Sequence, residues 1–141
     1  MATLYFAAAL FNSRETGFNV ILAERIEKMG HEVLLPQRDG FEFVKLEKTL
    51  SLKMSTTVTA NELQTIIYLF DIGWFVKKSD VVIANLDEPV DEGLVIEIAF
   101  AKMMEKGVIV FRTDVRSPYG NSSDNFGGGH FFPALQANVF I

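Results

Sequence analysis

Residues 80–86 read Asp80-Val81-Val82-Ile83-Ala84-Asn85-Leu86, and this stretch decides the fold. It is a mostly apolar run of strand length, without the alternation of apolar and polar residues that marks a strand with one face in water. Strands covered on both faces have this pattern because their side chains are buried on either side, and they form the middle of parallel sheets. The sequence therefore predicts a parallel sheet with this strand inside it.

Strands and helices alternate on both sides of this run. The apolar spacing predicts strands at residues 4–9, 32–35, 108–111 and 138–141, and helices at residues 16–29, 60–78 and 92–106. Gly30 and Gly107 are expected to end the first and last helices, and Gly73 is a candidate bend in the long one. This alternation predicts an α/β fold, a doubly wound, Rossmann-like parallel sheet with helices on both faces.

The remaining segments carry loop signals or no clear pattern. Residues 37–40 and the run Gly127-Gly128-Gly129 are expected in loops. Residues 41–57 have a mixed pattern, which makes them a candidate flap or a family-specific insertion.

The composition bounds the kind of protein and the kind of partner. A chain of 141 residues predicts one domain, residues 1–141, with a core that needs neither disulfides nor a structural metal. Hydrophobic residues make up 49% and charged residues 22%, which is typical of a folded globular protein. The net charge of −5 and the lack of a dense basic run disfavour nucleic acid as a partner, because phosphates are bound through Lys and Arg. A small-molecule substrate is expected instead.

The absence of cysteine excludes disulfide frameworks, cysteine-ligated zinc and thiol nucleophiles. His31 and His130 lack the i,i+4 spacing of a helical metal pair, so no metal site is expected. Residues 1–11 are apolar but have no basic segment before them, which favours a first strand over a signal peptide. No run approaches the length of a membrane span, so we expect no membrane partner and a cytoplasmic location.

Ligands of open parallel sheets bind beyond the carboxyl ends of the strands. This rule selects the loops at residues 11–15, 37–40, 87–93 and 113–119. The loop after the first strand has neither a G-x-G-x-x-G nor a Walker A pattern, so a cradle for dinucleotide or nucleoside triphosphate phosphates is not expected. No cofactor is predicted.

Glu97 lies in a helical stretch, residues 93–101, whose other residues are apolar on every face. An ionised carboxylate buried without partners is costly, so Glu97 either pairs with an Arg or Lys or faces a cavity where its charge is used. Gly93 and Ala101 lie four residues before and after it, and both are small enough to leave room for a ligand over the carboxylate.

For three other residues, too, the sequence leaves open whether the side chain has a structural or a functional role. Asp91 directly precedes the helix, where it is a plain N-cap, an acceptor for a sugar hydroxyl, or both. Asp71 interrupts the apolar stretch at residues 68–74, which favours a side chain facing a cavity. Tyr5 lies on the first strand, and its hydroxyl group needs a partner if buried, which a nearby carboxylate would supply.

The sequence resembles the nucleoside 2-deoxyribosyltransferases. The resemblance rests on blocks in the family's order, at residues 4–11, 35–39, 80–87 and 91–93 followed by Glu97, within a region that extends roughly from residue 3 to residue 116. It implies a flavodoxin-like fold and an enzyme of nucleoside salvage that transfers 2-deoxyribose between nucleobases. Its partners would be a deoxynucleoside and a free nucleobase.

The resemblance also implies roles for individual residues. Glu97 is expected to attack C1′ of the sugar and form a covalent glycosyl-enzyme, and Asp71 to protonate the departing base. Asp91 is expected to bind the sugar hydroxyls, and Tyr5 to orient Glu97. These residue types suit the reaction, because departure of the base builds oxocarbenium character that a carboxylate stabilises and captures.

The remaining roles concern the base and the neighbouring subunit. By resemblance, Gln37 and Asp39 would read the edge of the nucleobase. Phe11 and Phe18, with Phe6 and Phe41, are candidates for stacking on the base or closing the pocket, with core packing as the alternative for each. The resemblance also implies a homo-oligomer in which a neighbouring subunit completes the pocket through an asparagine. Asn125 is the candidate, although residues 121–132 depart from the family pattern.

Two other functions remain open. A related hydrolase would cleave 2′-deoxynucleoside 5′-monophosphates, but a carboxylate such as Asp91 where the 5′-phosphate must sit would repel that group. A module that senses nucleosides would bind without turnover, because a fold alone does not establish catalysis.

Overall fold

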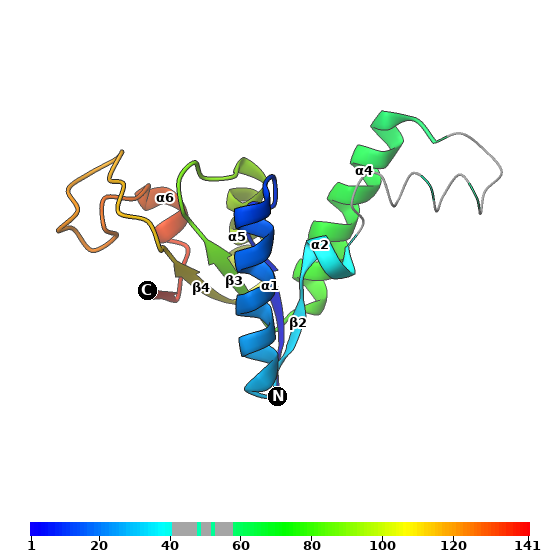
Figure 1. The fold of residues 1–141 in the computed structure, drawn as a ribbon, viewed down its shortest axis with the longest axis horizontal. Helices are drawn as coiled ribbons and strands as arrows, with labels where there is room; N and C mark the ends of the chain where they lie inside the picture. The colour runs from blue at the N-terminus through cyan, green and yellow to red at the C-terminus, as the bar shows by residue number, and fades with distance from the viewer. Residues whose placement is uncertain (41–47, 49–51, 53–57) are drawn as a thin grey trace.

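The strand predicted from residues 80–86 lies at the centre of the sheet in the computed structural model, which describes residues 1–40, 48, 52 and 58–141 (Figure 1). It is β3 (Val81–Asn85), and its neighbours are β1 (Thr3–Ala7) and β4 (Gly107–Phe111). The edges are β2 (Glu32–Leu34) and β5 (Val139–Phe140). Every pairing is parallel, and the order is β2-β1-β3-β4-β5. The prediction of a doubly wound, flavodoxin-like parallel sheet is therefore confirmed.

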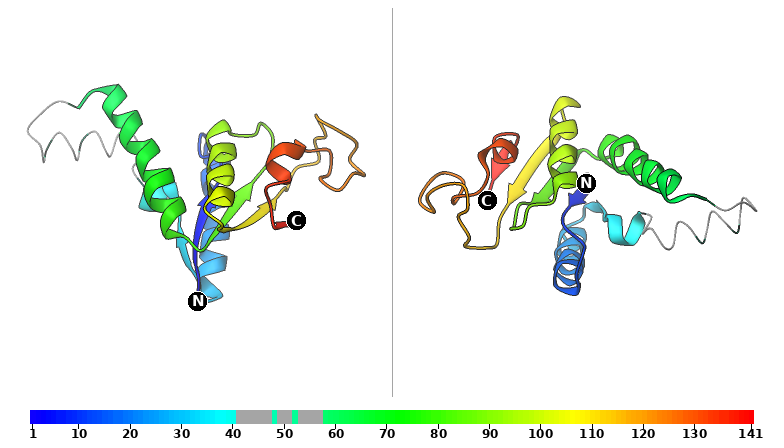
Figure 2. Two further views of the ribbon diagram at one scale, coloured as in Figure 1. Left: turned by 180° about the vertical axis from the view of Figure 1, so that it is seen from behind. Right: turned by 90° about the horizontal axis from the view of Figure 1, so that it is seen from above.

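Helices cover both faces of the sheet (Figure 2). α1 (Ser13–Lys28) lies on one face, and α5 (Glu92–Met103) lies on the other, in contact with the π-helical segment η1 (Asp71–Val76). The side chains of β1 divide the core between these faces: Leu4 and Phe6 pack with residues of α1, whereas Tyr5 and Ala7 pack with residues of α5 and η1. A strand with both faces buried explains why the first strand reads as a continuous apolar run.

The long helix predicted at residues 60–78 is not α-helical throughout. α4 (Ala60–Phe70) begins with a capping box between Thr59 and Glu62 and projects away from the sheet (Figure 1). From Asp71 the chain continues as η1, which contains Gly73. A π-helical turn holds more residues than an α-helical turn, so it changes the direction of the side chains that follow.

The two glycines predicted to end helices behave differently. Gly30 follows α1 with a φ of 91°, a left-handed conformation that favours glycine, and that prediction is confirmed. The prediction for Gly107 is wrong, because α5 ends at Met103 and Glu105 adopts the left-handed conformation, with a φ of 57°. Gly107 is instead the first residue of β4, where an added Cβ would lie 3.2 Å from Cγ2 of Val81 on the adjacent strand.

Two further boundaries differ from the prediction. α1 begins at Ser13, three residues earlier than predicted, because the side chain of Asn12 accepts hydrogen bonds from the backbone N–H groups of Arg14 and Glu15. Residues 37–40, predicted as a loop, fall mostly in the short helix α2 (Pro36–Asp39), with proline at its first position. The glycine run 127–129 does lie in a loop, followed by α6 (Phe131–Ala134).

Residues 41–47, 49–51 and 53–57, which make up most of the candidate flap and include Phe41, lie outside the described residues. Within the described part of the chain, every helix is too short or too polar to cross a membrane.

Candidate functional site

Tyr5 and Glu97 form the centre of the site. The Tyr5 hydroxyl group, 1% exposed on β1, donates a hydrogen bond to Oε1 of Glu97 on α5, with an O–O distance of 2.8 Å. The Tyr5 ring stacks on Phe75 of η1, with ring centroids 5.5 Å apart. Among the described residues, Glu97 forms no ion pair. A packed tyrosine therefore fixes one oxygen of this carboxyl group.

Three carboxyl groups influence one another at this place. Burial raises the pKa of Glu97 to about 8; the Tyr5 hydrogen bond lowers it, and the negative charges of Asp71 and Asp91 raise it further. Burial also raises the pKa of Asp71 to about 6. Burial, followed by the charge of Glu97, raises the pKa of Tyr5 well above its usual 10, so the Tyr5 hydroxyl remains a donor. At neutral pH, Glu97 is therefore mostly protonated and Asp71 mostly ionised.

The fold brings these groups together from three elements. Tyr5 comes from β1, Asp71 is the first residue of η1, and Glu97 comes from the first half of α5. Asp91 is the N-cap of α5, and its Oδ1 accepts a hydrogen bond of 2.8 Å from the backbone N–H of Leu94. An added Cβ on Gly93 would lie 3.0 Å from that same Oδ1, so the missing side chain leaves space for the Asp91 carboxylate.

Gln37 and Asp39 lie on α2, beyond the carboxyl end of β2. Gln37 is tied to α1: its Nε2 donates to the Thr16 carbonyl oxygen over 2.9 Å, and its Oε1 accepts from Nδ2 of Asn19 over 3.1 Å. The carboxylate of Asp39 accepts from the backbone N–H of Leu35 over 2.9 Å and pairs with Arg38. Asp39 therefore holds α2 in place, and the described contacts give it no link to the three carboxyl groups.

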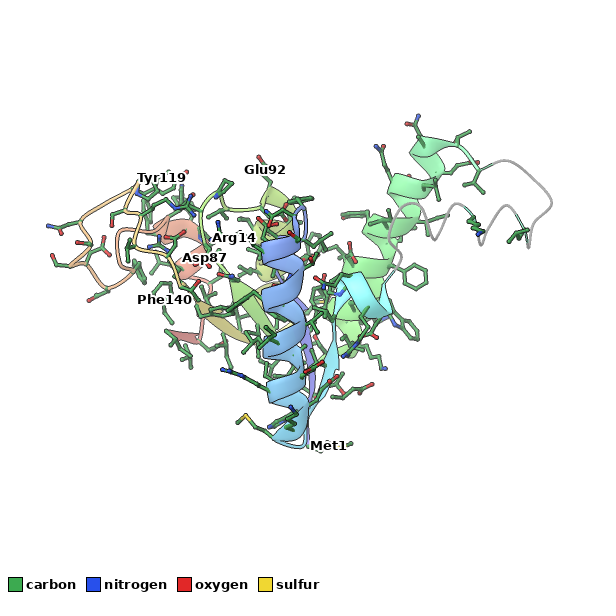
Figure 3. All side chains as sticks on the ribbon, viewed as in Figure 1. Met1, Arg14, Asp87, Glu92, Tyr119 and Phe140 are labelled. Atoms are coloured by element: carbon green, nitrogen blue, oxygen red, sulfur yellow. The ribbon has the colours of Figure 1, made fainter. Side chains whose placement is uncertain are left out.

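The aromatic candidates occupy different environments. Phe11, after β1, is 76% exposed, whereas Phe6 is fully buried in the core. Phe18 on α1 is 37% exposed and packs against Phe111, with ring centroids 6.2 Å apart. Asn125 is exposed in the loop that follows β4. That loop, on which Figure 3 labels Tyr119, lies at the opposite end of the molecule from α4. The chain thus brings Tyr5, Asp71, Asp91 and Glu97 together and leaves Asn125 elsewhere.

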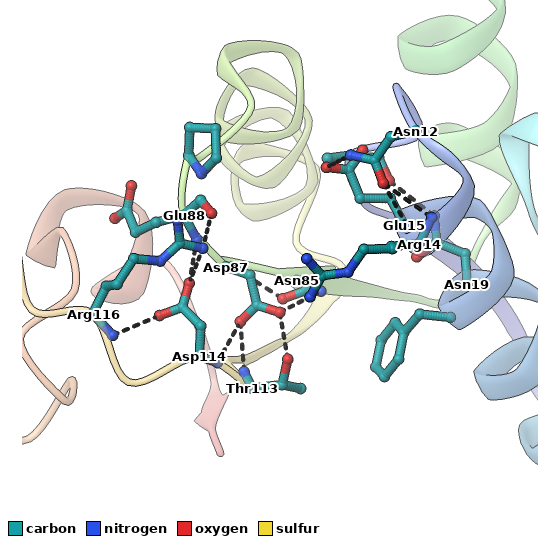
Figure 4. A pocket seen from close by; sticks show the side chains of 13 residues that line it. Asn12, Arg14, Glu15, Asn19, Asn85, Asp87, Glu88, Thr113, Asp114 and Arg116 are labelled. Carbon is teal, nitrogen blue, oxygen red and sulfur yellow. Dashed lines mark hydrogen bonds and ion pairs between the residues drawn. The ribbon is translucent and has the colours of Figure 1, made fainter.

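A separate cavity of about 610 Å³ lies at the carboxyl edge of the sheet, between the start of α1 and the loops after β3 and β4 (Figure 4). Arg14 extends across it from α1 toward Asn85 and Asp87. Asp87 accepts hydrogen bonds from the backbone N–H groups of Thr113 and Asp114, and Asp114 accepts one from the N–H of Glu88. The two aspartates therefore join the two loops.

Both of these loops are among the ligand loops predicted from the sequence, whereas the hydrogen bonds that Asp87 and Asp114 exchange between them, and a role for Asn19, were not predicted. Asn19 gives one local signal: a polar residue of low helix propensity, within α1, between Phe18 and Val20. Among the described residues, no group of three or more His, Asp or Glu side chains is arranged to hold a metal ion.

The comparisons with known proteins agree with this fold. The sequence profile described as nucleoside 2-deoxyribosyltransferase matches residues 4–130, whereas no curated protein matches the chain. Similar solved structures include a 2-deoxyribosyltransferase from Bacillus psychrosaccharolyticus, with a TM-score of 0.66 and 16% identity over 99% of this chain and 85% of that one. A CMP N-glycosidase from Clostridium botulinum gives a TM-score of 0.55 and 19% identity over 99% of this chain and 87% of that one. These two likenesses show the fold. Because the family profile spans most of the sequence, the chain belongs to the nucleoside 2-deoxyribosyltransferase family, a family of enzymes.

Proposed function

We propose that this protein transfers 2-deoxyribose from one nucleobase to another through a covalent glycosyl-enzyme on Glu97. The observation that carries the proposal is the carboxyl group of Glu97, held by Tyr5 beside Asp71 and Asp91. Membership of the family supports the reaction class, and the similar Bacillus psychrosaccharolyticus structure is a 2-deoxyribosyltransferase.

In the first step, a carboxylate oxygen of Glu97 attacks C1′ of the deoxynucleoside. The C1′–N bond breaks, its electron pair goes to the departing base, and Asp71 supplies a proton to that base. Because Tyr5 holds Oε1, the attacking oxygen is Oε2. In the second step a nitrogen of the incoming base attacks C1′, the C1′–Oε2 bond breaks, and Asp71 takes the proton back. Asp91, the N-cap of α5, accepts hydrogen bonds from the sugar hydroxyls.

The reactive protonation state is a minor one. The reaction needs Glu97 ionised and Asp71 protonated, whereas pKa values of about 8 and about 6 place the proton on Glu97 at neutral pH. In the free protein the reactive arrangement is therefore a minor one, since each group is mostly in its other form and the two groups titrate as a coupled pair. Positive charge that develops on the sugar stabilises the ionised form of Glu97, so the transition state favours the reactive arrangement.

Hydrolysis of a nucleotide is the second candidate, because the similar structure from Clostridium botulinum is a CMP N-glycosidase. Asp91 weighs against it, since a carboxylate at the sugar end of the site repels a 5′-phosphate. Binding of nucleosides without turnover is the third.

One assay separates these functions. The protein is incubated with a deoxynucleoside and a different free base, and in parallel with a deoxynucleoside 5′-monophosphate, and the products are separated by chromatography. We expect a new deoxynucleoside in the first incubation. Release of free base without a new nucleoside would identify a hydrolase, cleavage of only the monophosphate would identify a nucleotide hydrolase, and binding without products would identify a sensor.

Glu97→Gln tests the nucleophile. The variant keeps an acceptor for the Tyr5 hydroxyl but lacks the carboxylate, so exchange should fall by about 1000-fold or more. Glu92→Gln is the matched control, because it removes an exposed carboxylate from the same helix, and it should exchange at the wild-type rate. Near-normal exchange by a folded Glu97→Gln variant would rule out the proposed role.

A further inference from the structure

Asn19 is one of two polar residues buried among the described part of the chain, at 2% exposure; the other is Ser79. A buried amide needs hydrogen-bond partners, and the Nδ2 group of Asn19 has two hydrogens to donate. One goes to the carbonyl oxygen of Ala9 over 3.0 Å, and the other goes to Oε1 of Gln37 over 3.1 Å. Asn19 thereby joins α1 to the loop after β1 and to α2.

These contacts leave the Gln37 amide one orientation. Its Oε1 faces the N–H of Asn19, and its Nε2 faces the carbonyl oxygen of Thr16. If the amide were turned over, its oxygen would face the Thr16 oxygen and its N–H₂ group would face that of Asn19, so both contacts would be repulsive. The fixed amide retains one N–H hydrogen and one oxygen lone pair that these contacts do not use.

The sheet places this amide after β2, the strand beside the one that carries Tyr5. Gln37 follows β2, Tyr5 is on β1, and Asp91 and Glu97 follow β3, and these three strands are neighbours in the sheet. For a sugar held between Tyr5 on β1 and the carboxyl groups of Asp91 and Glu97, which follow β3, we take the base to lie toward β2, the next strand after β1. Because Asp39 is occupied by Arg38 and the Leu35 N–H, the amide of Gln37 is the better placed of the two to read the base.

We propose that Asn19 is a positioning residue that fixes the amide of Gln37 and so sets which nucleobase edge the protein prefers. This inference rests on the proposed function, because it assumes that a base lies against Gln37. Asn19 lines the cavity of about 610 Å³ but is only 2% exposed, so we assign its effect to its hydrogen bonds and not to direct contact with a substrate. Its effect is transmitted through the hydrogen bond to Oε1 of Gln37.

Asn19→Asp gives the sharpest test. An aspartate has no hydrogen to donate to Oε1 of Gln37 and accepts only, so the wild-type orientation of the Gln37 amide loses this hydrogen bond and its oxygen faces a second oxygen instead. Exchange is measured with a panel of four nucleobases, and the result is the ratio of kcat/KM between the best two bases of the wild type. We expect that ratio to change about tenfold or more in Asn19→Asp and Asn19→Ala, because a site built around a fixed polar group discriminates strongly.

Ser79→Ala is the matched control. The Ser79 hydroxyl donates a buried hydrogen bond of 2.9 Å to the Val76 carbonyl oxygen. Ser79 lies just before β3, at the end of the sheet where the strands begin, whereas Gln37 lies beyond the carboxyl end of β2. Loss of this bond costs stability and should leave the ratio within about twofold of wild type. Gln37→Ala and the double variant Asn19→Ala/Gln37→Ala should give the same ratio as each other, because Asn19 acts through Gln37.

Several results would overturn the proposal. These are an unchanged ratio in folded Asn19 variants, or a double variant whose ratio differs from that of Gln37→Ala. If Asn19→Asp and Asn19→Ala do not fold, Asn19→Ser retains one donor and is expected to give a smaller change in the ratio. If the wild type does not exchange bases, the proposed function fails. The role of Asn19 can then still be tested by calorimetric titration of the protein with the same four free bases. Equal relative affinities for these bases in the wild type and the Asn19 variants would refute that role.

Discussion

The Tyr5 hydroxyl opposes the two influences that raise the pKa of Glu97, namely burial and the neighbouring negative charges. Its hydrogen bond favours the ionised carboxylate, the form that attacks C1′ in the proposed reaction. With Glu97 titrating above Asp71, log kcat/KM should rise to about pH 6, stay level to about pH 8 and fall at higher pH. In this order of pKa values, the lower bend reports Asp71 and the upper bend reports Glu97.

Tyr5→Phe should therefore move the upper bend to higher pH, because the variant loses the contact that lowers the pKa of Glu97. The level part of the profile should fall about tenfold for each pKa unit of that movement, since the reactive fraction depends on the difference between the two pKa values. The measurement is the pH dependence of kcat/KM between pH 4 and pH 10. The phenylalanine ring keeps the stacking on Phe75, so the change isolates the hydroxyl group.

Thr65→Val serves as control, because it removes a hydroxyl from the exposed side of α4 and should leave both bends in place. A shift of the lower bend in Tyr5→Phe would show instead that Glu97 titrates below Asp71. No shift at all would show that the Tyr5 contact does not act on the reacting carboxylate.

The individual residues differ in how visible they are in the sequence. Glu97 is visible because it is a charge in an apolar helix, and Tyr5 because a buried hydroxyl needs a partner. Asn19 is not, because its partners Ala9 and Gln37 are ten and eighteen residues away, and only the packing of α1 against two loops brings them together. The local sequence pattern carries no information about hydrogen bonds between residues that are this far apart in the chain.

At the scale of elements, the loops after β3 and β4 are joined by carboxylates. Asp114 accepts from the N–H of Glu88 over 2.6 Å and pairs with the buried side chain of Arg112 over 2.9 Å. Asp87 accepts in return from the N–H of Asp114. These bonds hold the loop that leads into Asp91 and α5.

Asp114→Asn should lower the free energy of unfolding at pH 7 by about 1–3 kcal/mol, because charged hydrogen bonds to buried partners are lost. Burial alone would raise the pKa of Asp114, but the N–H groups of Glu88 and Arg116 and the Arg116 guanidinium outweigh it and lower the pKa below 3.8. A lowered folded-state pKa contributes stability above pH 3.8 that is lost as the pH falls through the folded value. Urea unfolding should therefore show a large difference from wild type at pH 7 and a smaller one near pH 3.

Glu24→Gln, which removes an exposed carboxylate from α1, is the control and should change stability by less than about 0.5 kcal/mol. A difference between Asp114→Asn and wild type that persists unchanged at low pH would mean that the charge of Asp114 does not stabilise the loops.

The order and type of the strands and of the long helices were predictable, whereas the short helices α2 and α6, the π-helical η1 and the ends of the elements were not. Apolar periodicity alone predicts the strands and the crossover helices, because it reflects which face is buried. The end of α5 depends on a hydrogen bond from the Lys106 N–H to the Ala101 carbonyl oxygen around a left-handed Glu105, a conformation that glycine would normally supply. Gly107 is needed instead for the close approach of β3 to β4. Gly73 marks the region of η1 as a candidate bend, but the sequence does not predict that the turn is π-helical.

At the scale of the whole molecule, the exposed large apolar side chains of the described residues include two groups of three. Tyr68, Leu69 and Trp74 lie on α4 and η1, and Phe131, Phe132 and Leu135 lie on and beside α6. Clustered exposed apolar residues mark interfaces between proteins. They favour the expected homo-oligomer, in which the loop carrying Asn125 reaches the site of a neighbouring subunit.

Mixing inactive variants tests this shared site. If Asn125 completes the neighbour's site, Asn125→Ala and Glu97→Gln should each lose most exchange activity, yet subunits of the two variants refolded together should recover it. When equal amounts of the two variants assemble at random, about a quarter of the sites combine an intact Glu97 with an intact Asn125 from the neighbouring subunit. About a quarter of wild-type activity should therefore return.

Asp71→Asn mixed with Glu97→Gln is the control. Because Asp71 and Glu97 belong to the same chain's site, every site in that mixture lacks one of them and no activity should return. Full activity of Asn125→Ala alone would exclude sharing through this residue, as would a mixture with Glu97→Gln that stays inactive although light scattering shows mixed oligomers.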